Sequence, residues 1–388
     1  MHNGENIEHA IMHSMLGDII GFGNGKTEFN DGTIFNSENF SNYAQVGADY
    51  SNQLVLKFLF DGGFSTHPKP DWRISDDTIM LMANCKGIIQ WKTDKKNHID
   101  DLMISIKKEY MKLVDDKQTL HARKTFVQVH NGGITTTKNL IKLLEGEDYM
   151  NLPYDDRAGG SGGSMRSAIF GVIFWHGDDI LKLIRSSIES TLMTHPNATA
   201  FLGSLVVALF ASYALQGDEI HLWPPKMIAL LESPHVDTMI RTLRPDIMAF
   251  YERDKLTFLE KWKNYYEERF HQSSLAYKKS KAMMYASERS LFYHRFAKFS
   301  QSIYPGAGGD DSVIIAFDCL ADCDGSVDKI CTYSMLHVGD SDTTGAICGF
   351  LYGLVYGTSD VSNVMLGNIK VEQLPEVRKI IKIIKTII

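Results

Sequence analysis

The sequence predicts an all-α protein, and three observations carry that prediction. Few segments alternate apolar and polar residues, which is the pattern of half-buried strands. Apolar residues recur instead at helical spacing in many separate segments. One uncharged segment, residues 196–217, has the length and apolarity of a helix at the centre of a large helical fold.

The expected helices follow the chain from end to end. Each is an apolar segment of helical spacing that is bounded by polar or turn residues. They cover residues 12–20, 50–60, 78–91, 98–114, 165–175, 180–192, 199–215, 226–231, 254–269, 312–320, 327–338, 343–356 and 370–388.

Residues 196–217 are long enough to raise the question of a membrane span. Asn197, Gly203, Ser204, Ser212 and Gln216 interrupt the apolar run, and no second run of this length follows. We therefore expect a helix buried in the core, and no membrane partner.

Composition and charge narrow the class of protein. The 388 residues are 44% hydrophobic and 22% charged, as in ordinary globular proteins. The formal net charge of −7 offers no basic field to nucleic acid, and the polar segments 92–123 and 251–298 interleave acidic with basic residues.

Five cysteines, an odd number, and a polar start without a signal core predict reduced thiols and a cytoplasmic protein. Without an internal repeat or a linker, we expect one domain over residues 1–388, and a monomer.

The strongest local signal is the run Ser75-Asp76-Asp77-Thr78 before an apolar helix. Ser75 is a good helix N-cap, and acidic residues in a first turn stabilise a helix through its dipole. Cap and dipole pairing would explain this run on its own.

A second signal of the same kind stands about 265 residues later, in Gly339-Asp340-Ser341-Asp342-Thr343. Its helix carries glycines at positions 345, 349, 353 and 357, four apart on one face. Glycine inside a helix costs roughly 1 kcal/mol relative to alanine. The stripe therefore predicts a second helix packed very closely against this one, which would place the Asp-rich start in the interior.

The two helix starts together suggest a metal site. Four carboxylates and several hydroxyls, without a His or Cys ligand, suit a hard oxygen-seeking cation, which is Mg²⁺ or alternatively Mn²⁺. If the starts meet, they can hold two cations about 3.5–4 Å apart and orient a water molecule. Spacing alone leaves open whether they meet.

Other motifs are weaker. The Gly-rich run from Arg157 to Arg166 can hold phosphate oxygens on exposed amides, but a flexible turn is its default interpretation. Residues 306–309 and 131–133 are weaker examples. Cysteines 319, 323 and 331 lack a paired His motif for zinc, and His195 is more commonly structural than functional in such a position.

Five motifs in order resemble one family. They are Gly17-Asp18 with Asn24-Gly-Lys-Thr-Glu-Phe29, the run from Trp72 to Thr78, the Gly-rich run 159–166, the helix 187–195 that ends in His195, and Gly339-Asp-Ser-Asp-Thr343. The order resembles the ADP-ribosylglycohydrolases, also called ADP-ribosyl-acceptor hydrolases, and most closely their arginine-specific branch.

That resemblance implies an orthogonal helical bundle with two Mg²⁺ ions in a cleft. It implies a hydrolase that cleaves the bond between ribose C1″ and a modified arginine side chain, with ADP-ribosylated proteins as substrates and ADP-ribose as product. The implied metal ligands are Ser75, Asp76, Asp77, Asp340, Asp342 and Thr343. The implied catalytic residues are Asp76, Asp77, Asp340 and Asp342, with Asp77 as a candidate general base, and Glu28 is a candidate contact of the leaving guanidinium. The implied ADP-ribose contacts are Gly160, Ser161, Gly162, Gly163, Met165 and His195, with Tyr304, Gly306 and Gly308 near the adenine.

Two positions depart from the arginine-specific branch, which is expected to carry Trp where Thr27 and Ala307 stand here. The departures bear on acceptor choice and on adenine stacking, for which Tyr304 is the remaining candidate. Two alternatives therefore stay open. One is a hydrolase of serine-linked ADP-ribose, poly-ADP-ribose or ADP-ribosyl esters, and the other is an ADP-ribose-binding protein without turnover. A helical scaffold without a ligand would leave the motifs as coincidences.

Overall fold

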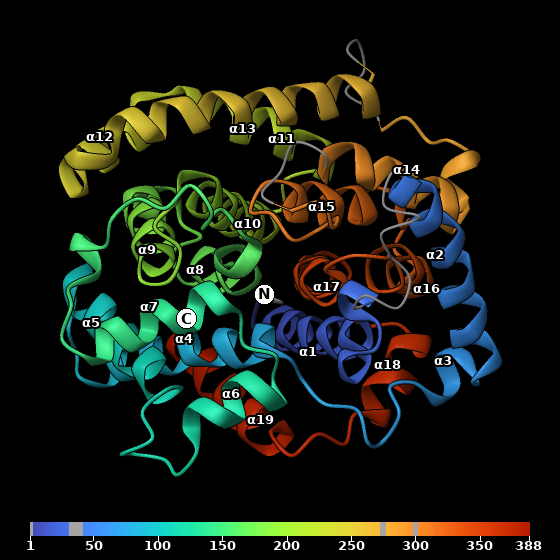
Figure 1. Ribbon diagram of the computed structural model, residues 1–388, viewed down its shortest axis with the longest axis horizontal. Coiled ribbons are helices and arrows are strands. Elements are labelled where there is room, and N and C mark those ends of the chain that lie inside the picture. Colours follow the sequence, from blue (N-terminus) through green and yellow to red (C-terminus); the bar gives the residue numbers. More distant parts are fainter. Residues whose placement is uncertain (1–2, 31–41, 272–276, 298–301) are drawn as a thin grey trace.

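The computed structural model describes residues 3–30, 42–271, 277–297 and 302–388 (Figure 1). Within these ranges the chain forms nineteen α-helices and no strand, which confirms the all-α prediction. The helices are α1 (Asn3–Phe22), α2 (Tyr43–Phe60), α3 (Gly63–Thr66), α4 (Asp76–Thr93), α5 (Ile99–Lys112), α6 (Ala122–Val129), α7 (Ile134–Leu144), α8 (Ala168–Ile173), α9 (Ile180–Leu192), α10 (Ala198–Gln216), α11 (Trp223–Glu232), α12 (Pro234–Leu243), α13 (Met248–Arg269), α14 (Ala286–Ala297), α15 (Asp311–Asp322), α16 (Val327–Ile330), α17 (Ser341–Tyr356), α18 (Asp360–Asn368) and α19 (Leu374–Ile387).

Helix α10 is the apolar centre of the fold, with α8, α9, α13, α15 and α17 packed around it. The Asn197 side chain accepts a hydrogen bond from the backbone N–H of Thr199 and begins the helix, and Gly217 at φ 77° ends it. Among the described residues it is the one helix long and apolar enough to cross a membrane, and 83% of its most apolar window is buried inside the protein. The prediction of a buried core helix is confirmed.

Helices α1 and α17 approach each other through glycines. A Cβ added to Gly349 would lie 2.2 Å from the carbonyl oxygen of His13, and one added to Gly345 would lie 2.7 Å from that of Gly17. Gly353 meets the backbone of Ala10 in the same way. The glycine stripe therefore predicted a real close contact, although its last member, position 357, lies beyond the helix end.

Two expected helices differ from those observed. The prediction of one helix over residues 327–338 is wrong, because α16 ends at Ile330 and a π-helical turn over Cys331–Met335 follows. The chain must leave the helix there to enter Gly339 at φ 131°, a conformation that favours glycine. The prediction over 165–175 is also wrong, because a 3₁₀ turn at Ser161–Arg166 precedes the short α8. The helices α3, α6, α7, α12, α14 and α18 lie outside the expected helical segments.

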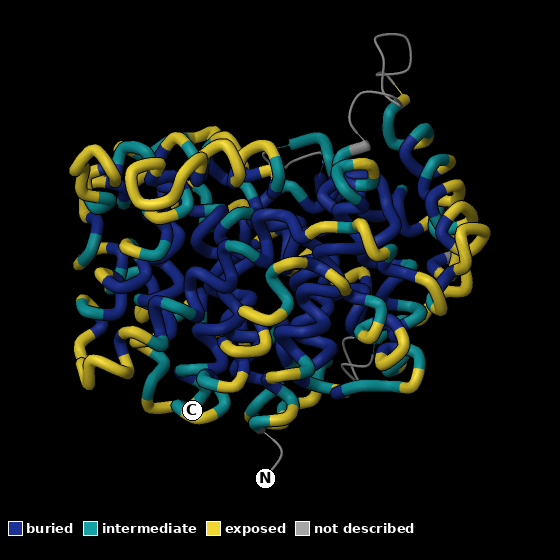
Figure 2. The backbone as a smooth tube through the Cα atoms, turned by 90° about the horizontal axis from the view of Figure 1, so that it is seen from below, coloured by how far each residue is buried: buried dark blue, intermediate teal, exposed yellow. Residues whose placement is uncertain are grey.

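Burial increases toward the middle of the molecule (Figure 2). Helix α13 runs along one edge of the molecule beside α11 (Figure 1). The C-terminal end of α1 and the N-terminal starts of α4 and α17 lie in the interior, and these three ends form the site described next.

Candidate active site

The start of α4 is buried and capped twice. Its own N-cap Ser75 accepts a hydrogen bond from the backbone N–H of Asp77 at 3.2 Å. Asp18 of α1 accepts further hydrogen bonds from the backbone N–H groups of Ser75 at 2.9 Å and Thr78 at 3.1 Å. Asp76 and Asp77 are thereby held in the interior, although charged residues are rarely buried without a partner.

The start of α17 reaches the same place because α1 and α17 pack so closely. The backbone N–H of Asp340 donates to the carbonyl of Pro305 at 2.8 Å, and the Ser341 hydroxyl donates to the carbonyl of Gly21 at 2.9 Å. Asp342 and Thr343 in the first turn are buried. The contact with Gly21 sets the start of α17 beside the end of α1, which continues into the loop that carries Glu28.

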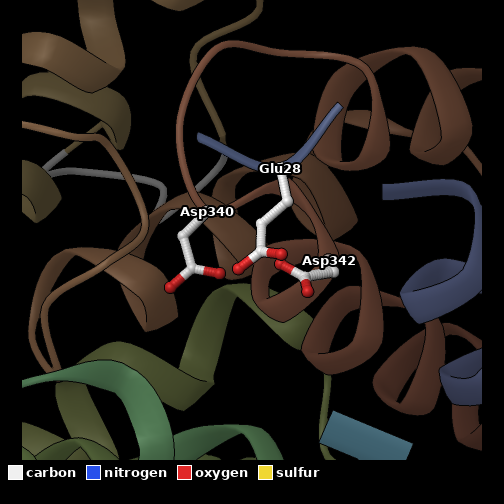
Figure 3. Close-up of side chains that lie close together, drawn as sticks. All are labelled: Glu28, Asp340 and Asp342. Carbon is white, nitrogen blue, oxygen red and sulfur yellow. The ribbon is translucent and has the colours of Figure 1, made fainter. Parts of the chain in front are cut away.

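Three carboxylates converge at this point. Glu28, Asp340 and Asp342 each offer an oxygen, and these three oxygens lie within 4.8 Å of one another (Figure 3). Glu28 points into the cluster from the loop after α1, and Asp340 and Asp342 point into it from the start of α17. Of the described residues, these form the one group of three or more acidic, His or Cys side chains spaced to hold a metal ion.

The carboxylates at the start of α4 interact electrostatically with those of this cluster. Burial, and after it the charges of Asp76 and Asp18, raises the pKa of Asp77 well above its usual range. Burial, and after it the charges of Glu28 and Asp77, does the same for the pKa of Asp342. Burial raises the pKa of Asp76 to about 7, with Asp340 adding to the rise. The two predicted helix starts therefore meet.

A divalent cation fits this set of residues. All donors are oxygens, and no Lys or Arg of the described ranges forms an ion pair with any of these carboxylates. Asp77 Oδ1 is buried and has no hydrogen-bond partner. Carboxylates that are buried, mutually repelling and partly unsatisfied match the ligand preference of a hard cation such as Mg²⁺.

A cleft of about 400 Å³ opens beside the carboxylates. The Gly-rich run 159–166 forms one wall, and its Ser161 hydroxyl donates to Asp340 Oδ2 at 2.9 Å. The backbone N–H of Ser161 donates to the carbonyl of Ala307 at 3.0 Å, so the two Gly-rich loops pair along this wall. The predicted residues that line the cleft are Asp76, Asp77, Gly160, Ser161, Gly162, Met165, His195, Asp340 and Thr343, together with Glu28.

His195 closes the far side of the Gly-rich wall. Its ring leaves room only for glycine at position 162, because an added Cβ would lie 2.5 Å from Cε1. Its Nδ1 lies 2.9 Å from the Thr194 hydroxyl. Burial, and then the charge of Arg166, lowers the pKa of His195 to about 3, so the ring is neutral at pH 7. A neutral ring in this wall is suited to contact and hydrogen bonding, and it supplies no charge.

Other predicted contacts do not line this cleft. Gly163 packs against Thr191, and the backbone N–H groups of Gly306 and Gly308 donate to Asp311. Tyr304 lies edge-on against Phe29 with ring centroids 5.5 Å apart. Ser75 and Asp342 stand behind the lining residues, Ser75 as a cap and Asp342 as a member of the carboxylate cluster.

Two parts of the site carry no clear functional signal in the sequence. Asn131 donates to Glu28 Oε2 at 2.7 Å, and the backbone N–H of Gly133 donates to Asp76 Oδ2 at 3.2 Å. The segment Asn131-Gly-Gly gives only a weak loop signal in the sequence, yet it donates hydrogen bonds to two carboxylates of the cluster. Asp18 was noted only as part of a motif, and its role as a cap for α4 depends on a contact between residues 57 positions apart.

Comparisons with known proteins assign the chain to a family. The family described as ADP-ribosylglycohydrolase matches residues 4–385. A Dictyostelium discoideum protein named ADP-ribosylhydrolase ARH1 is 32% identical over 92% of this chain and 88% of its own length. A protein of Acanthamoeba polyphaga mimivirus, whose name assigns it by prediction to the ADP-ribosyl glycohydrolases, is 31% identical over 90% of this chain. The chain spans 63% of the length of that viral protein.

A solved structure titled "ADP-ribosylglycohydrolase-related protein complex" has the same fold. The superposition covers 100% of this chain and 99% of that chain, with a TM-score of 0.53 and 17% identity. At this identity the likeness concerns the fold alone.

Proposed function

This chain belongs to the ADP-ribosylglycohydrolase family, and from that premise we propose that it is a Mg²⁺-dependent hydrolase that removes mono-ADP-ribose from modified arginine side chains. The observation that carries the proposal is the meeting of the α4 and α17 carboxylates beside a Gly-rich wall. A fold without a ligand would not be expected to bury this many unpaired acidic side chains.

Two Mg²⁺ ions would be held by Asp76, Asp77, Asp340, Asp342 and Thr343, with Ser75 and Glu28 adjoining. When bound, the ions would fix the ribose hydroxyls and lower the pKa of a water molecule. Manganese has the same ligand preference and is the alternative ion.

The protein's own groups account for the remaining chemistry. The oxygen of the attacking water bonds to ribose C1″ as the bond from C1″ to the guanidine nitrogen breaks. Asp77 Oδ1, which has no other hydrogen-bond partner, accepts the proton of the water, and that proton passes to the leaving nitrogen. The surrounding carboxylates stabilise the positive charge that develops on the ribose. Ser161 holds Asp340 in place through its hydroxyl.

The choice of arginine rests on charge and on resemblance. Glu28 lies in the loop that resembles the arginine-specific branch, and it lines the cleft beside the carboxylates. A guanidinium is attracted to such a surface, whereas a serine side chain gains nothing from it. We further propose that the protein acts as a single-domain cytoplasmic monomer on ADP-ribosylated proteins.

The test compares an arginine-modified peptide with a serine-modified one, each with Mg²⁺ and with EDTA. We expect Mg²⁺-dependent release of ADP-ribose from arginine, and loss of that release in Asp77→Ala. Release from serine alone would overturn the acceptor assignment. ADP-ribose binding without release from either peptide would overturn the hydrolase itself and favour a non-hydrolytic binding protein.

A further inference from the structure

A second pocket is lined in part by the same loop that carries Glu28. Its volume is about 190 Å³, and Gly23, Lys26 and Thr27 of that loop form one wall. Glu28 and Phe29 of the same loop line the catalytic cleft. The segment from Gly23 to Phe29 is therefore shared between the two cavities.

Three lysines line this pocket, against one acidic side chain. Lys26 and Lys57 are exposed, and neither forms an ion pair with a described residue. The Lys69 ammonium group is held in position by hydrogen bonds to the Thr66 hydroxyl at 3.0 Å and to the carbonyl of Asp61. With Asp61 as the single opposing carboxylate, the pocket carries a net positive charge on a protein of net charge −7.

The floor of the pocket is apolar and preformed. The ring of His67 packs against Phe58 at 4.3 Å and against Trp72 at 5.1 Å between centroids. Burial lowers the pKa of His67, so its ring is neutral at pH 7 and the lysines supply the charge. A floor of packed, mutually tilted rings beside exposed lysines accommodates the methylene groups of a side chain that ends in a carboxylate.

The distance along the backbone from Lys26 in this pocket to Glu28 in the catalytic cleft is short. Lys26 precedes Glu28 by two residues, and consecutive Cα atoms are about 3.8 Å apart, so their Cα atoms lie at most about 7.6 Å from each other. An extended peptide covers that distance in two to three residues. A side chain two or three positions from a residue in the cleft can therefore reach the lysines.

We propose that the pocket formed by Lys26, Lys57 and Lys69 binds an acidic side chain of the substrate protein, close in sequence to its ADP-ribosylated residue. This inference rests on the proposed function for the identity of the modified residue. The pocket adds a preference for sequence context, because it is complementary to a carboxylate and would repel a lysine or arginine at the same position.

The test uses three peptides with a central ADP-ribosylarginine and with Glu, Gln or Lys at the second and third positions on both sides. We expect the KM for the Glu peptide to be about two- to fivefold lower than for the Gln peptide, as exposed charge pairs supply, and kcat to be the same. The difference in KM between the Glu and Gln peptides should become smaller in added salt, because the lysines are exposed and salt screens their charge.

The charge-reversal variant K26E/K57E should invert the order of the peptides, with the Lys peptide now binding best. The control variant K108E/K124E carries the same change of net charge on α5 and α6, outside the pocket, and should keep the original order. An unchanged order in K26E/K57E would overturn the proposal.

A turnover-independent measurement separates this inference from the proposed function. Fluorescence anisotropy of the unmodified Glu and Gln peptides reports docking alone. Tighter binding of the Glu peptide that is lost in K26E/K57E, without release of ADP-ribose from any peptide, would support the pocket and overturn the arginine hydrolase. Release at equal KM from all three peptides, with equal anisotropy, would overturn the pocket and leave the hydrolase intact.

Discussion

The carboxylate of Asp18 in α1 caps helix α4 by accepting a hydrogen bond from the backbone N–H of Ser75 at 2.9 Å. Burial raises the pKa of Asp18 to about 6, yet the side chain is retained at a place where it supports the helix that carries Asp76 and Asp77. We expect Asp18→Ala to lower the free energy of unfolding by about 1–3 kcal/mol, because buried N–H groups lose their acceptor. We also expect it to weaken Mg²⁺ binding, since the ligands on α4 would shift.

Urea unfolding measures the first effect and calorimetric titration with Mg²⁺ the second. Asp71→Ala is the matched control, because Asp71 is an exposed acidic residue just before the same helix. Wild-type Mg²⁺ affinity in Asp18→Ala would show that Asp18 has no part in placing the ligands.

Removal of divalent cations should destabilise the protein. The clustered carboxylates repel one another, and a cation that binds only the folded state adds about 2.7 kcal/mol at a hundredfold excess over its Kd. Thermal unfolding in EDTA should therefore begin at a lower temperature than in Mg²⁺. In Asp342→Asn, which removes one charge from the cluster, the EDTA-treated protein should be more stable than wild type and should gain less from Mg²⁺. Equal stability of the wild type with and without Mg²⁺ would contradict a cation site.

The glycine contact between α1 and α17 should tolerate no side chain. Gly349→Ala places a methyl group 2.2 Å from the His13 carbonyl oxygen, and overpacking of this kind costs about 1–3 kcal/mol. Gly367→Ala is the control, because nothing lies within 4 Å of its added Cβ in α18. It should raise stability by about 0.5–1 kcal/mol through the higher helix propensity of alanine. Chemical denaturation of both variants decides whether packing or propensity governs position 349.

A buried ion-pair cluster should make stability depend on pH. Asp318 is fully buried between Arg269 and Arg289, which hold its pKa below the usual value despite its burial. Because the folded pKa is lower than the unfolded pKa of about 3.9, this contribution is complete above that value and is lost as pH falls through the folded pKa. Asp318→Asn should cost about 3–5 kcal/mol near pH 7, because it leaves buried arginines without their partner.

Measuring the free energy of unfolding of wild type and Asp318→Asn between pH 3 and pH 8 tests the direction of this pH dependence. The difference in stability should be constant above about pH 5 and should narrow below about pH 4. Asp324→Asn is the control, because its ion pairs with Lys279 and Lys329 are exposed and should be worth less than about 1 kcal/mol. A difference that widens toward low pH would contradict the direction of the pKa shift.

Local signals accounted for much of the fold and for part of the site. Ser75 was recognisable as a cap because capping is decided within three residues. The glycine stripe on α17 predicted a close helix contact because its cost to the helix needs compensation. Both inferences concern short-range physics that a sequence displays directly.

The parts that were missed depend on contacts distant in sequence or on short elements. Asp18 becomes important only when α1 meets the start of α4, because it accepts from the backbone N–H of Ser75, 57 residues away. Asn131 becomes important only when the loop after α6 meets Glu28, 103 residues away. Helix α12 begins with Ser233-Pro234, a recognisable start, but its ten residues are too few for a clear periodic pattern. The end of α16 at Ile330 and the π-helical turn that follows it have no signal in local helix propensity.

The seam between α1 and α17 also orders events during synthesis. Gly17 and Gly345 are in backbone contact, yet they leave the ribosome 328 residues apart, which at roughly 5–20 residues per second is on the order of tens of seconds. During that interval the face of α1 that packs against α17 has no partner. Asp340 and Asp342, which lie beside Glu28 in the folded protein, have not yet been synthesised. The carboxylate cluster can therefore assemble only after Asp342 has been synthesised, so the proposed cation site cannot form earlier in translation.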